Sequence, residues 1–206
     1  MGKPAQELLK AKKYDVLISM LTDRFGTDGT AAIWLDAERR LEGFLKTTAK
    51  LSSGEQLHAE GTIYPACAIY LAIAERRGRD EAFQIMETFM RTVALEAGAK
   101  LQKIVKPRFM RRIFMKGFGV VGSKMFGETA GFEQKLYENK STHLRMDILA
   151  CPYLRHCIAA DARELAPLFC ANDEYAYGNL PGIEFKRAGT LARGNDRCDF
   201  ELTLKG

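Results

Sequence analysis

Apolar residues along the first hundred positions recur with the period of an α-helix. Over residues 5–24 they are three, four and seven positions apart, which places them on one helical face. After a break at Gly26, a second stripe of this kind runs to about residue 50. Residues 62–77 are apolar on all sides, which is the pattern of a helix buried among other helices. The N-terminal half is therefore expected to be a lobe of packed helices.

The charge pattern changes after the last amphipathic helix of this lobe, which Asp80 caps and Gly98 is expected to end. Residues 100–116 combine an apolar stripe with a run of cations, and Pro107 is expected to break or kink this helix. The cations are Lys100, Lys103, Lys106, Arg108, Arg111, Arg112 and Lys116. We expect a solvated basic face, with attraction of an anionic substrate as the functional alternative. The five glycines from Gly117 to Gly131 predict a connecting loop.

Beyond residue 131, apolar and polar residues alternate with the period of a β-strand. Strands are expected at 132–137, 143–150, 183–191 and 198–204, the first two joined as a hairpin. Short helical segments are expected between them, at 155–160 and 162–170. The predicted fold class is α+β, with a helical lobe of about five helices (1–130) packed on an antiparallel sheet of about four strands with short inserted helices (131–206). The two lobes are expected to form one folding unit.

The composition is that of an ordinary globular protein and excludes several classes of protein. Of the 206 residues, 47% are hydrophobic and 28% are charged. The net charge of +5 is too small for a dedicated nucleic-acid binder. No apolar run approaches the ~18 residues of a membrane span, and the N-terminus lacks the apolar core of a signal peptide. We therefore expect a cytoplasmic protein with neither membrane nor nucleic acid as its partner, and we leave a homo-oligomer open.

The cysteines are concentrated in one stretch of the chain. Four of the five lie there: Cys151, Cys157, Cys170 and Cys198. In the cytoplasm they are expected to be thiols, metal ligands or nucleophiles rather than disulfides. The Cys-x-x-Cys pair of a structural zinc site is absent, so no cofactor is predicted, although a mixed Cys/Asp/His site for a divalent metal stays open. The fifth, Cys67, lies in the apolar helix and is expected to be a small buried residue.

Two of these cysteines have an aspartate close by in sequence, Cys170 with Asp173 and Cys198 with Asp199. A catalytic thiol needs a base or a cation to become a thiolate, because a carboxylate alone raises the thiol pKa. After folding, that help could come from His143, His156, Arg155 or Arg193. The alternatives are packing cysteines, a turn-forming Asp173 and a solvent-facing Asp199. No ligand spacing is found among the histidines, which are expected at the surface or at caps: His58, His143 and His156.

Four separated motifs in this stretch resemble a known family. They are Cys151-Pro-Tyr, Phe169-Cys-x-x-Asp173, the segment Arg187-Ala-Gly-Thr-Leu191, and Cys198-Asp-Phe200. In this order they are similar to the C-terminal signature of the L-2-amino-thiazoline-4-carboxylic acid hydrolase family. The resemblance covers roughly residues 144–204. Arg187 and Thr190 depart from the family's Arg-Thr-Leu-like spacing, so we carry over no role to Arg187.

The resemblance implies a hydrolase that opens a C–N bond of a cyclic amidine, such as a thiazoline carboxylate, and gives an N-carbamoyl cysteine. It implies a small anionic substrate, whose carboxylate an Arg would bind in bidentate fashion. The catalytic residues would come from the matched motifs: Cys151, Cys170, Asp173, Cys198 and Asp199. In one route a thiolate, of Cys170 or Cys198, adds to the ring carbon and water resolves the adduct. In the other route Asp173 or Asp199 activates water, with or without a metal.

Two other functions stay open on the residues alone. A non-catalytic binding or sensing module would show a closed, mainly apolar cavity with few polar groups. A metal- or redox-responsive protein would hold its sulfur atoms at bonding or ligand distances. An enzyme would instead place Cys170 or Cys198 at a pocket, with an aspartate within hydrogen-bond reach.

Overall fold

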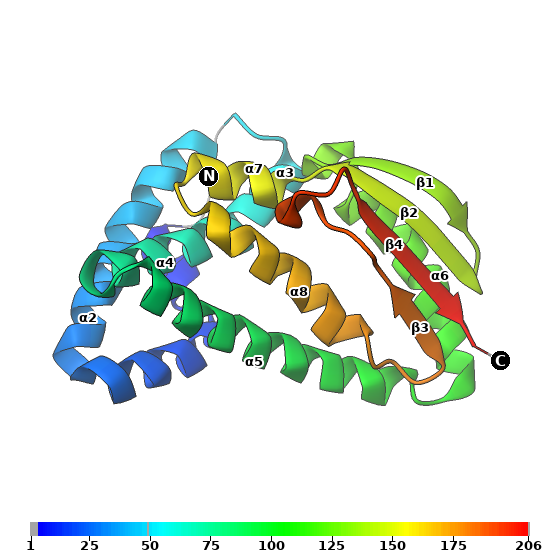
Figure 1. Ribbon diagram of the computed structural model, residues 1–206, viewed down its shortest axis with the longest axis horizontal. Coiled ribbons are helices and arrows are strands. Elements are labelled where there is room, and N and C mark those ends of the chain that lie inside the picture. Colours follow the sequence, from blue (N-terminus) through cyan, green and yellow to red (C-terminus); the bar gives the residue numbers. More distant parts are fainter. Residues whose placement is uncertain (1–3, 49, 206) are drawn as a thin grey trace.

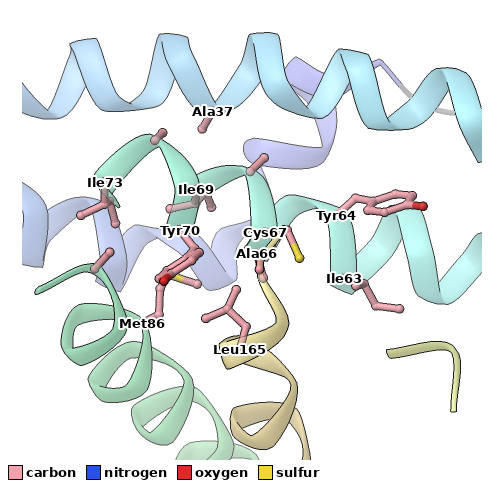
Figure 2. Packing of buried hydrophobic residues seen from close by; sticks show 14 of the residues in the cluster. Ala37, Ile63, Tyr64, Ala66, Cys67, Ile69, Tyr70, Ile73, Met86 and Leu165 are labelled. Carbon is pink, nitrogen blue, oxygen red and sulfur yellow. The ribbon is translucent and has the colours of Figure 1, made fainter. Parts of the chain in front are cut away.

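Helix α4 (Tyr64–Arg77) lies at the centre of the helical part, as its apolar run predicts. The computed structural model describes residues 4–48 and 50–205. Helix α4 packs against α1 (Ala5–Leu9), α2 (Asp15–Thr48) and α5 (Arg79–Val105), and also contacts α7 (Pro152–Ala159). Helix α3 (Ser53–His58) leads into it. Figure 2 shows side chains of α4 reaching towards Ala37 of α2 on one side and Met86 of α5 on the other. This cluster forms the larger hydrophobic core.

Short helical turns join these elements. They are η1 (Lys12–Tyr14), the π-helical turn η2 (Ala59–Ile63), η3 (Glu128–Ala130), η4 (Arg163–Leu165) and η5 (Leu191–Arg193). The expected break at Gly26 is present as a kink inside α2, where this glycine adopts φ 72° and ψ 173°. The chain therefore continues as helix directly after Gly26, without an intervening turn.

The C-terminal part contains four antiparallel strands in the order β1-β2-β4-β3, so the predicted α+β fold is confirmed. The strands are β1 (Glu133–Asn139), β2 (His143–Ala150), β3 (Ile183–Lys186) and β4 (Cys198–Leu204). Helix α6 (Arg108–Met125) lies along one face of the sheet, and α8 (Ala166–Tyr177) runs beside α5 (Figure 1). Between β2 and α8 comes the short helix α7 (Pro152–Ala159).

Several expectations about element ends are wrong, among them the helix expected to end at residue 170, which continues to Tyr177. The strand expected over 183–191 stops at Lys186, because the next backbone N–H groups bind the Asp199 carboxylate instead of a neighbouring strand. The loop expected from Gly117 is helix as far as Met125, and the helix expected to end at Gly98 continues to Val105.

Close packing explains two of these helical glycines. A Cβ at Gly98 would lie 2.7 Å from the Tyr175 carbonyl oxygen of α8, and one at Gly119 would overlap Oδ1 of Asn139 in β1. A missing side chain therefore lets neighbouring elements approach, and the surrounding packing outweighs the low helix propensity of glycine.

The inner face of the sheet forms a second apolar cluster with α6. Its buried strand residues are Leu144, Met146, Ile148, Ile183, Cys198, Phe200 and Leu202. In the register of β2 and β4, Ile148 is opposite Cys198 and Asp147 is opposite Asp199. Because side chains alternate between faces, Cys198 points into this cluster and Asp199 points to the other face. Within the described residues, none of the helices is both long and apolar enough to span a bilayer.

Candidate active site

A cavity of about 210 Å³ lies where the inner face of the sheet meets α8 and the turn from α3 to α4. Four of the five residues expected to be catalytic line it: Cys151, Cys170, Asp173 and Cys198. The fifth, Asp199, does not line it. Aromatic and aliphatic side chains complete the walls, including those of Phe126, Phe132, Phe169 and Phe200. The cysteine motifs, which are distant in sequence, therefore meet at one place.

Local structure explains this convergence. Cys151 follows the last residue of β2 and is the N-cap residue of α7, while Cys198 begins β4, which pairs with β2. Cys170 and Asp173 are three residues apart on α8 and thus lie on one face of that helix. Two strand ends and one helix face bring these residues to the same cavity.

Arg187 contacts Asp173 from the segment that follows β3. Its Nη1 donates to Asp173 Oδ2 at 2.8 Å, and its Nη2 donates to Glu174 Oε1 at 2.9 Å and to the Cys170 carbonyl at 2.7 Å. The side chain is only 2% exposed, and its guanidinium lies over the rings of Phe185 and Phe200. No role for this arginine followed from the sequence, because its contacts join segments that are distant in the chain.

The pKa of the Asp173 carboxyl is close to neutral pH. Burial raises its pKa to about 6, although the Arg187 guanidinium opposes the rise. The side chain keeps 27% exposure, and that exposure faces the cavities that it lines. A carboxylate with such a pKa is suited to general base catalysis.

The three cavity thiols are weak acids. Burial raises the pKa of Cys170 to about 12 and that of Cys151 to about 11, and it also raises the pKa of Cys198. Backbone groups oppose this rise at two of them. The Leu191 N–H donates to Cys198 Sγ at 3.2 Å. At Cys151 the first N–H groups of α7 act in the same direction, although none makes a capping hydrogen bond of ordinary geometry.

His58 also lines the cavity, but both of its ring nitrogens are engaged. Its Nε2 lies 3.0 Å from the Met125 carbonyl oxygen and its Nδ1 lies 3.0 Å from the Tyr153 hydroxyl. Because a carbonyl can only accept, Nε2 carries the proton, and Nδ1 of the neutral ring accepts from Tyr153. Burial lowers the pKa of His58 and so favours this neutral form. His58 therefore orients Tyr153 and is not a free base.

Two buried polar atoms at the cavity have no hydrogen-bond partner within the described residues. They are Asn172 Oδ1, an acceptor, and Arg187 Nε, a donor. Unpaired buried polar atoms are costly in a folded protein and call for an explanation. Both atoms have almost no accessible surface of their own, so a ligand with one donor and one acceptor would satisfy them only after neighbouring side chains at the cavity had shifted.

Asp199 binds backbone instead of facing the cavity. Its Oδ1 accepts from the N–H groups of Gly189 at 2.7 Å and Ala188 at 3.1 Å. Burial alone would raise the pKa of Asp199, but these hydrogen bonds hold it below its ordinary value. The carboxylate thus fixes the segment that follows Arg187.

The four residues that could have helped a thiol lie elsewhere. His156 is buried between the Tyr64 hydroxyl and Glu55, which Arg155 also contacts. His143 lies on the sheet between Glu138 and Glu201. Arg193 is largely exposed, 3.9 Å from Glu174. None of these four is among the residues that line the cavity.

The remaining cysteines form a separate pair. Cys67 is fully buried, as expected, and its Sγ lies 3.9 Å from that of Cys157 in the helical core. All five cysteines are free thiols. In the part of the chain that the structure describes, no three or more His, Cys, Asp or Glu side chains are gathered so that they could hold a metal ion.

Comparison with models of known families identifies the family. The model for L-2-amino-thiazoline-4-carboxylic acid hydrolase matches residues 56–202. The chain belongs to this family. The matched range contains every residue that lines the cavity. No curated protein and no solved structure matches the chain. The description of the L-2-amino-thiazoline-4-carboxylic acid hydrolase family indicates hydrolysis of a thiazoline carboxylate.

The sequence therefore indicated the cavity through its cysteine motifs but missed part of its lining. Arg187 stood inside a matched motif, and Tyr153 follows Cys151 in another. A buried arginine between two phenylalanines has no sequence signature, and neither does the hydroxyl–imidazole contact of Tyr153 and His58. Asn172 could have been found, because it stands next to Asp173 in the same motif.

Proposed function

We propose that this protein hydrolyses cyclic amidines of the thiazoline carboxylate type in the cavity described above. The observation that carries the proposal is the convergence of Asp173, Arg187 and three thiols at a cavity with an unpaired donor and an unpaired acceptor. An amidine offers N–H groups to Asn172 Oδ1 and a ring heteroatom to Arg187 Nε. A volume of about 210 Å³ suits a small ring.

Atom balance refines the bond that breaks. An N-carbamoyl cysteine product keeps the bond from the ring nitrogen to the amidine carbon. Water therefore adds to the amidine carbon, and the ring carbon–sulfur bond breaks to release the product thiol. No C–N bond is broken. The amidine C=N bond becomes a C–N bond of the urea product.

We propose Cys151 as the nucleophile. Cys170 has a higher pKa than Cys151, about 12, and among the described residues no backbone N–H group lowers it. Cys198 is 5% exposed, whereas Cys151 is partly exposed and begins a helix, where the N-terminal dipole stabilises a thiolate. Transfer of a proton from Cys151, with pKa about 11, to Asp173, with pKa about 6, costs roughly 7 kcal/mol. Transfer from water, with pKa near 16, would cost nearly twice that.

The reaction then proceeds in two steps. Cys151 gives its proton to Asp173 and adds to the amidine carbon, and the ring sulfur leaves with that proton. Asp173, again ionised, takes one proton from water as the hydroxyl group adds to the adduct, and Cys151 leaves and recovers that proton. The second proton of the water passes to the former ring nitrogen and completes the urea. No step requires an oxidant, a reductant or a further reactant.

The test is ring opening of L-2-amino-thiazoline-4-carboxylate, which is measured through the appearance of the product thiol. We expect the wild type and Cys170→Ser to turn over, and we expect Cys151→Ser and Asp173→Asn to be inactive while folded. Mass spectrometry of quenched wild-type reactions should find an adduct on the peptide that contains Cys151. A wild type that opens neither this compound nor related cyclic amidine carboxylates would refute the function. Full activity of Cys151→Ser would not contradict the function, but it would show that Cys151 is not the nucleophile and would favour direct activation of water.

A further inference from the structure

A second cavity, of about 290 Å³, adjoins the candidate active site. The two share four lining residues: Thr62, Phe169, Asn172 and Asp173. The second cavity lies between α5, α8 and the η1 turn, and apolar side chains such as Phe89, Met90 and Ala94 form most of its wall. Asp173 and the unpaired Asn172 Oδ1 therefore lie at a junction, with one cavity on each side.

The cation of the second cavity is Lys13. Its Nζ donates to the Gly61 carbonyl at 2.8 Å, so the amine lies one residue away from Thr62 at the junction. A lysine amine has three N–H donors, and two remain. No ion pair of Lys13 with an acid occurs within residues 4–48 and 50–205. Partial desolvation of the amine lowers the pKa of Lys13, although the residue as a whole is exposed.

Arg187, the cation of the first cavity, is already neutralised. It is bound to Asp173 and to Glu174, so the three groups together carry no net positive charge. Its unpaired Nε can donate one hydrogen bond but cannot balance the charge of a third carboxylate. A substrate carboxylate therefore finds its uncompensated cation at Lys13 and not at Arg187.

We propose that the two cavities form one binding site for an amphiphilic carboxylate. Lys13 binds the carboxylate, and the α5 wall holds an apolar portion of the substrate. The reacting group lies against Asp173 in the first cavity. This proposal about the substrate rests on the proposed hydrolase function. It extends the expected substrates to compounds larger than a thiazoline carboxylate. Lys13 and Tyr14 precede the range matched by the family model, so this rim is supplied by the chain's own N-terminal segment.

Equilibrium binding of straight-chain alkanoates tests the site without turnover. By calorimetry, octanoate should bind the full chain more tightly than hexanoate by about tenfold, because two further methylenes are buried. Octanol should bind about tenfold more weakly than octanoate, because it has no charge for Lys13. Affinity that is independent of chain length, or equal for octanol and octanoate, would overturn the proposal.

Substitutions at adjacent lysines give a matched comparison. Lys13→Met should weaken octanoate binding about tenfold without affecting octanol, and Lys13→Arg should retain it. Lys12→Met is the control, since Lys12 is in the same turn but lines neither cavity. Ala94→Phe should fill the groove and weaken both ligands. Equal effects of the Lys12 and Lys13 changes would refute the role of Lys13.

The outcome separates this inference from the hydrolase proposal. Octanoate has no amidine to hydrolyse, so its binding does not depend on catalysis. If octanoate binds as expected but no cyclic amidine is opened, the function fails and the site stands. If thiazoline carboxylate is hydrolysed with a KM that Lys13→Met leaves unchanged, and octanoate does not bind, the function stands and the inference fails.

Discussion

Arg187 and Asp173 form an ion pair of 2.8 Å beside the junction of the two cavities. The arginine comes from the segment after β3 and the aspartate from α8, so the pair ties the sheet to the helical part. Two opposing effects act on Asp173, because burial favours its neutral form and Arg187 favours its charged form. The effect of burial is the larger one, so the pKa of Asp173 is raised to about 6. A general base that acts near neutral pH needs such a pKa.

The pH dependence of activity should follow Asp173. A general base must be ionised, so we expect kcat/KM to fall as the pH drops below about 6, the pKa of this carboxyl. The measurement is a pH profile of ring opening on the wild type, with Asp196→Asn as control because the Asp196 side chain is 81% exposed and does not line the cavity. An acid limb centred near pH 4, as for an ordinary exposed aspartate, would contradict the assignment of Asp173 as base.

Asp173 should also make stability depend on pH, with a definite sign. Because its pKa is raised on folding, the folded chain holds more protons than the unfolded chain between pH about 4 and about 6. The contribution of Asp173 to the free energy of unfolding should therefore decrease as the pH rises through this window, by up to roughly 3 kcal/mol. In Asp173→Asn this decrease should disappear. Urea unfolding at several pH values measures it, and an identical slope in the variant would contradict the raised pKa.

Removal of Arg187 should leave two carboxylates without their partner. We expect Arg187→Met to lower the free energy of unfolding by about 3–5 kcal/mol, as for a broken buried ion pair. The acid limb of activity should shift to higher pH, because the charge that opposes the pKa rise of Asp173 is lost. Arg193→Met is the matched control, since Arg193 is 54% exposed and 3.9 Å from Glu174. Equal effects of the two changes would show that Arg187 is not the stabilising partner.

How far the sequence predicts this site depends on the kind of contact. Alternating residues in β4 correctly predict that Cys198 and Asp199 lie on opposite faces. The apolar run of α4 correctly predicts a central helix, because its pattern is local. The pKa of Asp173 could not be predicted, since it results from burial in the folded chain and from the opposing charge of Arg187, which lies on another element. The same is true of His58, which lies 95 residues before its partner Tyr153.

Asp199 should affect stability more than chemistry. Its carboxylate accepts from the N–H groups of Ala188 and Gly189, and charged hydrogen bonds of this kind contribute about 1.5–3 kcal/mol. We expect Asp199→Asn to lower the free energy of unfolding by somewhat less, about 1–2 kcal/mol, because the amide oxygen still accepts one bond. Asp196→Asn is the control, since that side chain is 81% exposed. Loss of turnover in Asp199→Asn with unchanged stability would instead favour a direct role in catalysis.

The helical glycines give a test of how closely α5 and α8 pack. A Cβ at Gly98 would lie 2.7 Å from a backbone oxygen of Tyr175, so Gly98→Ala must push α8 away and should cost about 1–3 kcal/mol. A Cβ at Gly117, inside α6, would meet nothing within 4 Å, so Gly117→Ala should gain about 0.5–1 kcal/mol through helix propensity. Because α8 carries Asp173, Gly98→Ala should also reduce turnover, whereas Gly117→Ala should not. Denaturant unfolding and ring-opening rates measure both effects, and a stabilising Gly98→Ala would show that α5 and α8 do not approach this closely.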